Sequence, residues 1–167
     1  MFEGNVIGHI KGEVEKVKAE TKKILGICSG EGITPADFRL ACQCVRVPTL
    51  SGHFLTVFVE TERPCSTEEA RAVYEAFNAE CAGRYGDLPS SPKRTIVVLD
   101  RPPQPYFDAN LEGGMATTIG MLQSSEAFAG GLQYQVLSNN TMKGAAKGMI
   151  QVAEYLYRKT DLLRRKA

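Results

Sequence analysis

A chain of 167 residues with a formal net charge of +1 has no excess of positive charge that would attract nucleic acid. Its length suits one domain, and 43% hydrophobic with 23% charged residues is typical of a globular protein. No apolar run approaches the roughly 20 residues that span a bilayer, and the N-terminus lacks the pattern of a signal peptide. We therefore expect a cytoplasmic protein with neither nucleic-acid nor membrane partners.

The first part of the chain predicts one helix and two strands. Residues 13–25 have the amphipathic pattern of a helix, and the glycine directly after them favours its end there. Residues 27–35, rich in glycine and serine, predict a loop. Residues 38–47 predict a strand that a proline ends. Residues 53–61 predict a second strand with apolar side chains on both faces, so we expect it to be buried.

The second part predicts two helices and three strands. Ser66 and Glu69 have the spacing of a capping box, which predicts a helix that extends to about residue 84. The proline-rich residues 101–105 cannot join a central strand and predict an extended connection. The remaining elements that we expect are strands over 94–100, 115–122 and 132–138 and a helix over 142–163. This order predicts an α+β fold, in which helices pack on one face of a mixed, largely antiparallel sheet.

The segment from Cys44 to His53 contains a guanidinium and an imidazole close to a predicted turn. Arg46 offers a planar, permanently charged group that suits a carboxylate or a phosphate. His53 is one of two histidines in the chain, and its side chain titrates near neutrality, where a general acid or base works best. Spacing alone leaves the simpler interpretation open, in which Arg46 is a surface residue and His53 is structural.

The five cysteines are an odd number without the spacing of a disulfide framework, so we expect free thiols. Cys42 and Cys44 would share one face of a strand, which keeps a metal or redox role conceivable. The sequence has no second cysteine or histidine pair at zinc spacing, and we predict no metal site. Cys65 precedes a helix cap, where a thiolate is favoured, but no base is close to it in sequence.

Several segments together resemble the catalytic domain of aspartate-semialdehyde dehydrogenases, in particular their fungal and archaeal branch. The sequence Cys-Val-Arg-Val-Pro-Thr-Leu-Ser-Gly-His at residues 44–53 is similar to that family's Cys-x-Arg-Val-Pro-x-x-x-Gly-His signature. Further matches in the family's order lie at residues 5–7, 12–16, 20–26, 88–93, 101–108 and 138–146. The resemblance implies a domain like the C-terminal domain of glyceraldehyde-3-phosphate dehydrogenase. It also implies that the protein forms a homo-oligomer through this domain, either a dimer or a tetramer.

The activity that the resemblance implies is the NADP-dependent reduction of β-aspartyl phosphate to aspartate semialdehyde, with release of phosphate, in amino-acid biosynthesis. Position by position, His53 takes the acid/base role, and Arg46 takes the role of binding the substrate carboxylate. Glu13 takes the place of the carboxylate that pairs with the substrate amino group, and Lys16 that of a phosphate-contacting lysine. Asn140 occupies a position near the nicotinamide amide. Without the resemblance, Glu13 and Lys16 would be a solvated helix ion pair, and Asn140 would be an N-cap for the last helix.

The resemblance also implies parts that this sequence does not match. No glycine-rich phosphate loop stands between a strand and a helix, and no cysteine corresponds to the family's nucleophile. We therefore expect residues 1–167 to be the catalytic and dimerisation domain, without the N-terminal NADP-binding Rossmann domain and inactive by itself.

Two alternatives stay open at this point, a non-catalytic dimerisation module and the same domain of a reductase for another acyl phosphate or acyl thioester. Glu13 favours the aspartyl substrate, because a substrate without an amino group leaves a buried carboxylate unpaired.

Overall fold

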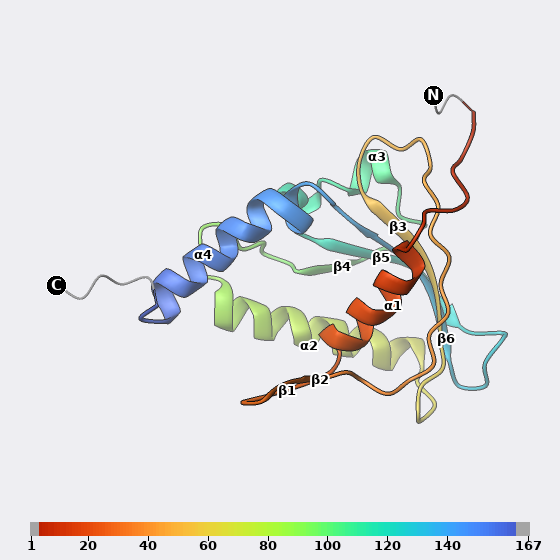
Figure 1. Cartoon of the computed structure of the whole chain (residues 1–167), viewed down its shortest axis with the longest axis horizontal. Coiled ribbons are helices and arrows are strands. Elements are labelled where there is room, and N and C mark those ends of the chain that lie inside the picture. The colour runs from red at the N-terminus through yellow and green to blue at the C-terminus, as the bar shows by residue number, and fades with distance from the viewer. Residues whose placement is uncertain (1–3, 163–167) are drawn as a thin grey trace. The chain divides into compact units, whose positions relative to one another are not determined.

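The computed structural model describes residues 4–162 and divides the chain into two compact units, Met1–Pro48 and Thr49–Ala167. Figure 1 shows the course of the chain through both units. Among the described residues, no helix is both long and apolar enough to cross a membrane.

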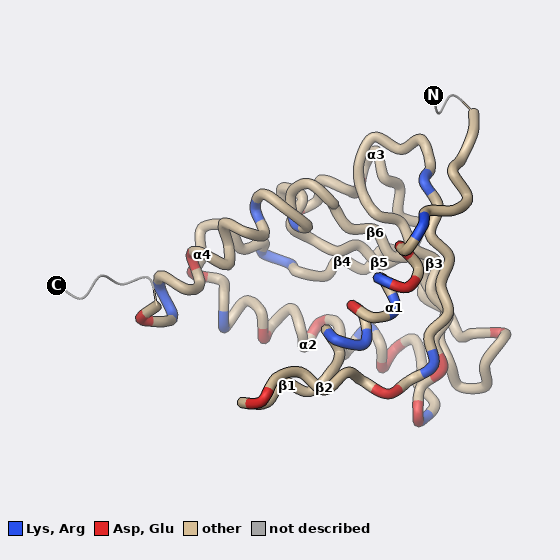
Figure 2. The backbone as a smooth tube through the Cα atoms, viewed as in Figure 1, with Lys and Arg blue, Asp and Glu red and all other residues tan. Residues whose placement is uncertain are grey.

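The first unit contains the helix α1 (Glu13–Ile24) and a hairpin of β1 (Ile27–Ser29) and β2 (Gly32–Thr34). Acidic residues in the first turn of α1 and lysines in its last turn both favour the helix dipole, and Figure 2 shows these charges along the helix. The predicted helix is confirmed to within one residue. The predicted loop over 27–35 is wrong, because a two-residue turn joins two strands of only three residues each, which are too short for a periodic pattern to reveal.

The strand predicted over residues 38–47 is also wrong. Only Arg46 in this segment forms a bridge, an antiparallel one with Ile7. The N–H of each of these two residues donates to the carbonyl oxygen of the other, at 2.9 and 3.1 Å. A strand needs a neighbour along its whole length, and the sequence pattern of one segment does not report whether that neighbour exists.

The second unit is built on a four-stranded sheet with the order β3-β6-β5-β4. Its strands are β3 (His53–Val59), β6 (Leu132–Ser138), β5 (Thr117–Ser124) and β4 (Ile96–Val98). β6 is antiparallel to β3 and to β5, whereas β4 is parallel to β5. The expected mixed, largely antiparallel sheet is therefore confirmed, although the strand predicted over 94–100 shortens to three residues.

Helix α2 (Thr67–Tyr85) covers one face of this sheet (Figure 1). The predicted capping box is confirmed, since Ser66 Oγ accepts from the Glu69 N–H at 3.1 Å and Glu69 Oε2 accepts from the Ser66 N–H at 2.8 Å. The buried side chain of Asn78 exchanges two hydrogen bonds of 2.8 Å with the backbone of Ile96. This amide takes the place of a further strand beside β4, whose outer edge would otherwise expose unpaired backbone groups.

The segment between β4 and β5 leaves the sheet, as the prolines predicted. Pro105 is the first residue of a short helix α3 (Pro105–Asp108), and a 3₁₀ turn η1 (Leu111–Gly114) follows. Neither element was expected, although proline is favoured at the first position of a helix.

The last predicted helix consists of two parts. A π-helical turn η2 (Met142–Ala146) leads directly into α4 (Lys147–Lys159). The extended backbone of Thr160, with φ −136° and ψ 166°, ends α4 before the predicted end. Residue 163, at which we expected the helix to stop, lies outside the described residues.

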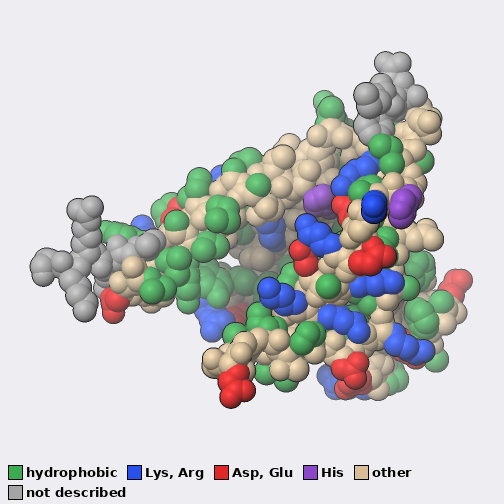
Figure 3. Space-filling model, viewed as in Figure 1, with side chains coloured by type: hydrophobic (Ala, Val, Ile, Leu, Met, Phe, Trp, Pro, Cys, Tyr) green, Lys and Arg blue, Asp and Glu red, His purple; other side chains and the backbone are tan. Residues whose placement is uncertain are grey.

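The buried position expected for the strand over 53–61 is wrong for this chain. β3 is an edge strand, and Phe54, Leu55 and Phe58 are 41, 48 and 55% exposed. The core of the unit lies further into the sheet, where Leu137 and Thr118 are almost completely buried. Hydrophobic side chains also gather on the visible face of α4 (Figure 3). Met149 of this helix is 69% exposed.

Candidate functional site

Arg46 and Glu13 form a direct ion pair in the first unit, with 2.6 Å between Arg46 Nη2 and Glu13 Oε1. Glu13 is the first residue of α1, and the backbone bridge to Ile7 fixes the position of Arg46. The side chains are 49 and 24% exposed, so the guanidinium stays open to solvent. The sequence predicted a binding role for each residue, and the structure adds that they contact each other.

The second carboxylate oxygen of Glu13 is the notable part of this pair. Oε2 is buried and has no hydrogen-bond partner among the described residues. A buried carboxylate oxygen without a donor is energetically costly, and most of them in proteins are paired. The guanidinium of Arg46 carries five N–H donors, of which Glu13 engages one. The pair therefore leaves guanidinium donors open to a carboxylate, next to a negative charge that attracts an ammonium group, and these are the two charged groups of an amino acid.

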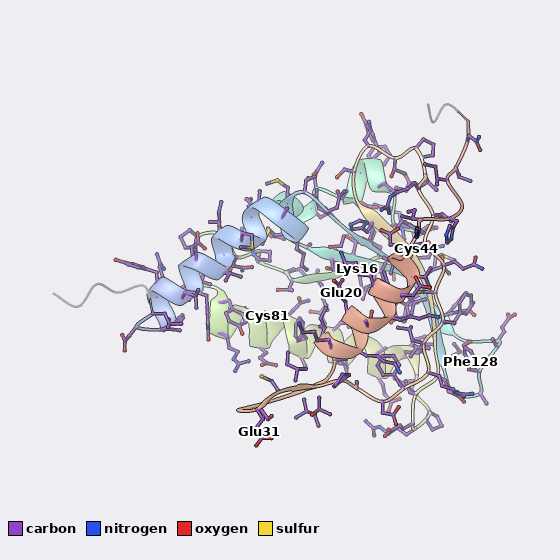
Figure 4. The ribbon with its side chains drawn as sticks, viewed as in Figure 1. Lys16, Glu20, Glu31, Cys44, Cys81 and Phe128 are labelled. Atoms are coloured by element: carbon purple, nitrogen blue, oxygen red, sulfur yellow. The ribbon has the colours of Figure 1, made fainter. Side chains whose placement is uncertain are left out.

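Lys16 lies one turn after Glu13 on α1. Its Nζ is 3.8 Å from Glu20 Oε1, and both side chains are more than half exposed. Figure 4 labels both residues on the helix. Such a long, solvated ion pair contributes little to stability, so the ammonium group is available to an anionic ligand.

His53 and Asn140 belong to the second unit, and Gly52 connects them. The Gly52 N–H donates to Asn140 Oδ1 at 3.0 Å, directly before His53 opens β3. Gly52 has a φ of 99°, and a Cβ there would lie 2.8 Å from a side-chain carbon of Leu137. Glycine is therefore required at this turn, and Asn140 fixes the backbone on which His53 is mounted.

Asn139, which the sequence analysis did not single out, is the residue that caps the last helix. Its side chain is buried, and its Oδ1 accepts from the N–H groups of Thr141 and Met142 and from the Thr141 hydroxyl. Its Nδ2 donates to the backbone oxygen of Ala109 and to the side chain of Asn110. The capping role considered for Asn140 thus belongs to Asn139. The Asn140 side chain accepts from the Gly52 N–H instead.

A row of polar residues crosses the sheet from His53. In the register, His53 lies opposite Ser138, and Ser138 lies opposite Thr117, so the three share one face. The hydroxyls of Thr117 and Ser138 are 3.5 Å apart, and Lys143 Nζ donates to Thr117 Oγ1 at 2.7 Å. Burial lowers the pKa of Lys143. No role was predicted for Lys143, because Thr117, which its side chain contacts, is distant in sequence.

All five cysteines are free, as expected. Partial burial raises the pKa of the Cys44 thiol, and the nearby Cys42 and Glu13 add to this shift, so Cys44 is not a favoured thiolate. Among residues 4–162, no cluster of three or more histidine, cysteine and acidic side chains has the arrangement of a metal site.

The structure thus brings Arg46 into contact with Glu13, and Asn140 into contact with Gly52, the residue before His53. Arg46 belongs to the first unit and His53 to the second. That they converge on one substrate remains a prediction.

The fold of this chain is that of the C-terminal domain of glyceraldehyde-3-phosphate-dehydrogenase-like enzymes. An aspartate-semialdehyde dehydrogenase with NADP from Candida albicans has a TM-score of 0.74 and 30% identity, over 92% of this chain and 44% of that one. Aspartate-semialdehyde dehydrogenase II from Vibrio cholerae has a TM-score of 0.72 and 25% identity, over 93% of this chain and 42% of that one.

The family described as semialdehyde dehydrogenase, dimerisation domain, matches residues 2–143, and the chain belongs to this family. The aspartate-semialdehyde dehydrogenase of Archaeoglobus fulgidus is 40% identical over 154 residues, which cover 91% of this chain and 43% of the relative. That of Candida albicans is 35% identical over 161 residues, with coverages of 91 and 43%. The resemblance found in the sequence is therefore confirmed. The chain spans less than half the length of these relatives and matches their C-terminal part.

Proposed function

We propose that this chain is the substrate-binding and dimerisation part of an aspartate-semialdehyde dehydrogenase, which reduces β-aspartyl phosphate to aspartate semialdehyde and phosphate. The observation that carries the proposal is the Arg46–Glu13 pair with its unpartnered Glu13 Oε2. This pair is complementary to the α-amino and α-carboxylate groups of an aspartyl substrate. Such a reaction belongs to the biosynthesis of lysine, threonine and methionine, and a cytoplasmic location suits it.

Each residue has a separate task in this proposal. Arg46 binds the substrate carboxylate, Glu13 accepts from its ammonium group, and Lys16 stabilises the negative charge of the phosphate that leaves. A thiolate from the part of the relatives that this chain does not match would displace that phosphate and form a thioester.

His53 moves the proton of the reductive step. It donates a proton to the thioester carbonyl oxygen as that carbon is reduced. It takes the proton back when the carbon–sulfur bond breaks, which releases the aldehyde and restores the thiolate.

The residues present fit the nicotinamide end of NADP. Asn140 uses its Oδ1 for Gly52, and no hydrogen bond of the described residues engages its Nδ2, which is free to donate to a carboxamide. When bound, NADPH supplies the hydride for the thioester carbon. We propose that a Rossmann domain outside this chain holds the phosphates and adenosine of the cofactor.

The exposed apolar residues of β3 support homodimerisation. Phe54 and Phe58 share one face of this edge strand and are 41 and 55% exposed. Exposed apolar side chains of this kind are typical of surfaces that another protein covers. The family description as a dimerisation domain agrees with this proposal.

A hybrid enzyme tests the proposed activity. In this hybrid, the chain is fused behind the N-terminal part of the Archaeoglobus fulgidus relative, the part outside the matched region. We expect NADP-dependent oxidation of aspartate semialdehyde in the presence of phosphate, and no turnover by the chain alone. Arg46→Ala and His53→Ala should each remove most of the activity, whereas Arg84→Ala, which breaks an exposed helix ion pair, should not. A folded hybrid that keeps its activity with His53→Ala contradicts the proposal and leaves the non-catalytic dimerisation module.

A further inference from the structure

A cavity of about 180 Å³ with both apolar and polar lining residues lies in the second unit. Its lining comes from the end of α2, the connection before β4 and the start of the last helix. The residues that matter for its chemistry are Cys81, Tyr85, Ser91, Thr95, Lys143 and Gln151. Figure 4 labels Cys81 on α2. A cavity of about 150 Å³ admits benzene, so this one has room for an ion of a few heavy atoms.

The cavity contains a cation and no acid. Lys143 Nζ donates to Thr117 Oγ1 at 2.7 Å, and no carboxylate of the described residues pairs with it. None of the residues that line the cavity is aspartate or glutamate. Burial lowers the pKa of Lys143, and the nearby Cys81 opposes this shift only in part. A bound anion would compensate the rest of the desolvation.

The remaining polar groups point to the same kind of ligand. Ser91 Oγ accepts from Gln151 Nε2 at 2.8 Å, so its own hydrogen is free for another acceptor. Tyr85 and Thr95 also line the cavity. Glu154, which follows Gln151 on α4, is engaged elsewhere, because its two oxygens accept from the N–H and hydroxyl of Ser90.

We propose that this cavity binds a small oxyanion of the size and charge of inorganic phosphate. Lys143 provides the charge, and the hydroxyl of Ser91 donates to an oxyanion oxygen. This site uses other residues than the one proposed for the leaving phosphate at Lys16. The inference does not depend on the proposed enzymatic activity, because it concerns binding to the second unit only.

Calorimetric titration of the chain with inorganic phosphate at low ionic strength tests the proposal. Lys143→Met should weaken phosphate binding by about tenfold or more, the factor that corresponds to ~1.4 kcal/mol. Lys147→Met is the matched control, since it removes the same charge one turn later, where Nζ lies 3.4 Å from the Gly113 carbonyl oxygen. Lys147→Met should leave the affinity within about twofold of the unsubstituted chain.

Three results would overturn the proposal. They are the absence of phosphate binding to the unsubstituted chain, unchanged binding by Lys143→Met, and loss of binding with Lys16→Met alone.

A second measurement does not depend on any variant's folding. Addition of phosphate to the ¹⁵N-labelled unsubstituted chain should shift the amide signals of Ser91, Thr95 and Gln151. Shifts confined to α1 would instead place the phosphate at Lys16 and contradict the assignment.

Discussion

Asn140 Oδ1 accepts a hydrogen bond from the Gly52 N–H at 3.0 Å, across 88 residues of sequence. This contact joins the loop before the last helix to the turn that presents His53. A residue proposed to face the cofactor and a residue proposed to move the proton therefore share one piece of backbone. Displacement of either loop would move both groups.

The first prediction concerns this contact. Asn140→Ala should remove the acceptor of the Gly52 N–H and lower the free energy of unfolding by about 1 kcal/mol, the typical value of one hydrogen bond. Chemical denaturation of the chain measures the change. Asn139→Ala is the comparison and should cost about 3 kcal/mol or more, because it leaves several buried groups unpaired. Equal losses for both variants would contradict the distinction between the two asparagines.

The second prediction separates the tasks of Glu13 and Arg46. In the hybrid enzyme, Glu13→Gln keeps the shape of the side chain but loses the charge that faces the substrate ammonium group. We expect kcat/KM to fall by about 10- to 100-fold, mainly through KM, because the lost interaction binds the substrate and the transition state alike. Glu20→Gln, also on α1 but solvated, should change kcat/KM by less than about twofold. A loss confined to kcat would assign Glu13 a different role.

The third prediction is a dependence of stability on pH. The hydrogen bonds from the Arg101 side chain, followed by the one from the Gln104 N–H, hold the pKa of Asp108 below its usual value. A depressed folded-state pKa means that this stabilisation is complete above the unfolded pKa of about 3.9 and is lost as the pH falls below it. Thermal unfolding between pH 7 and pH 3 should show this loss, and Asp108→Asn should flatten it.

At neutral pH the same Asp108→Asn variant should be less stable by about 2 to 3 kcal/mol, since Asp108 is buried and its bonds are charge-assisted. Asp100→Asn, at an exposed ion pair with Arg71, serves as the control and should leave both the stability and its pH profile nearly unchanged.

The fourth prediction concerns the exposed edge strand. Phe58→Asp should shift the chain from dimer to monomer, because it places a charge on an apolar surface that we propose the partner covers. Light scattering after size-exclusion chromatography measures the mass. Val73→Asp, at an apolar position on α2 that is more exposed than Phe58, should leave the mass unchanged. A monomeric unsubstituted chain at micromolar concentration would contradict the proposed dimerisation surface.

The sequence alone determined the features that depend on neighbouring residues. The capping box of Ser66 and Glu69 and the limits of α1 follow from local hydrogen bonds and local charge, which a window of a few residues contains. The signature at residues 44–53 identified the family for a similar reason, because the type and spacing of its residues are themselves the signal.

Which distant groups meet depends on the folded arrangement of the whole chain. The segment at 38–47 had the composition of a strand but no neighbour along its length, and the apolar strand β3 came to lie at an edge. The contacts of Glu13 with Arg46 and of Lys143 with Thr117 join residues 33 and 26 positions apart. Burial, pairing and charge compensation depend on what other parts of the chain place alongside a residue, and a linear pattern does not contain that information.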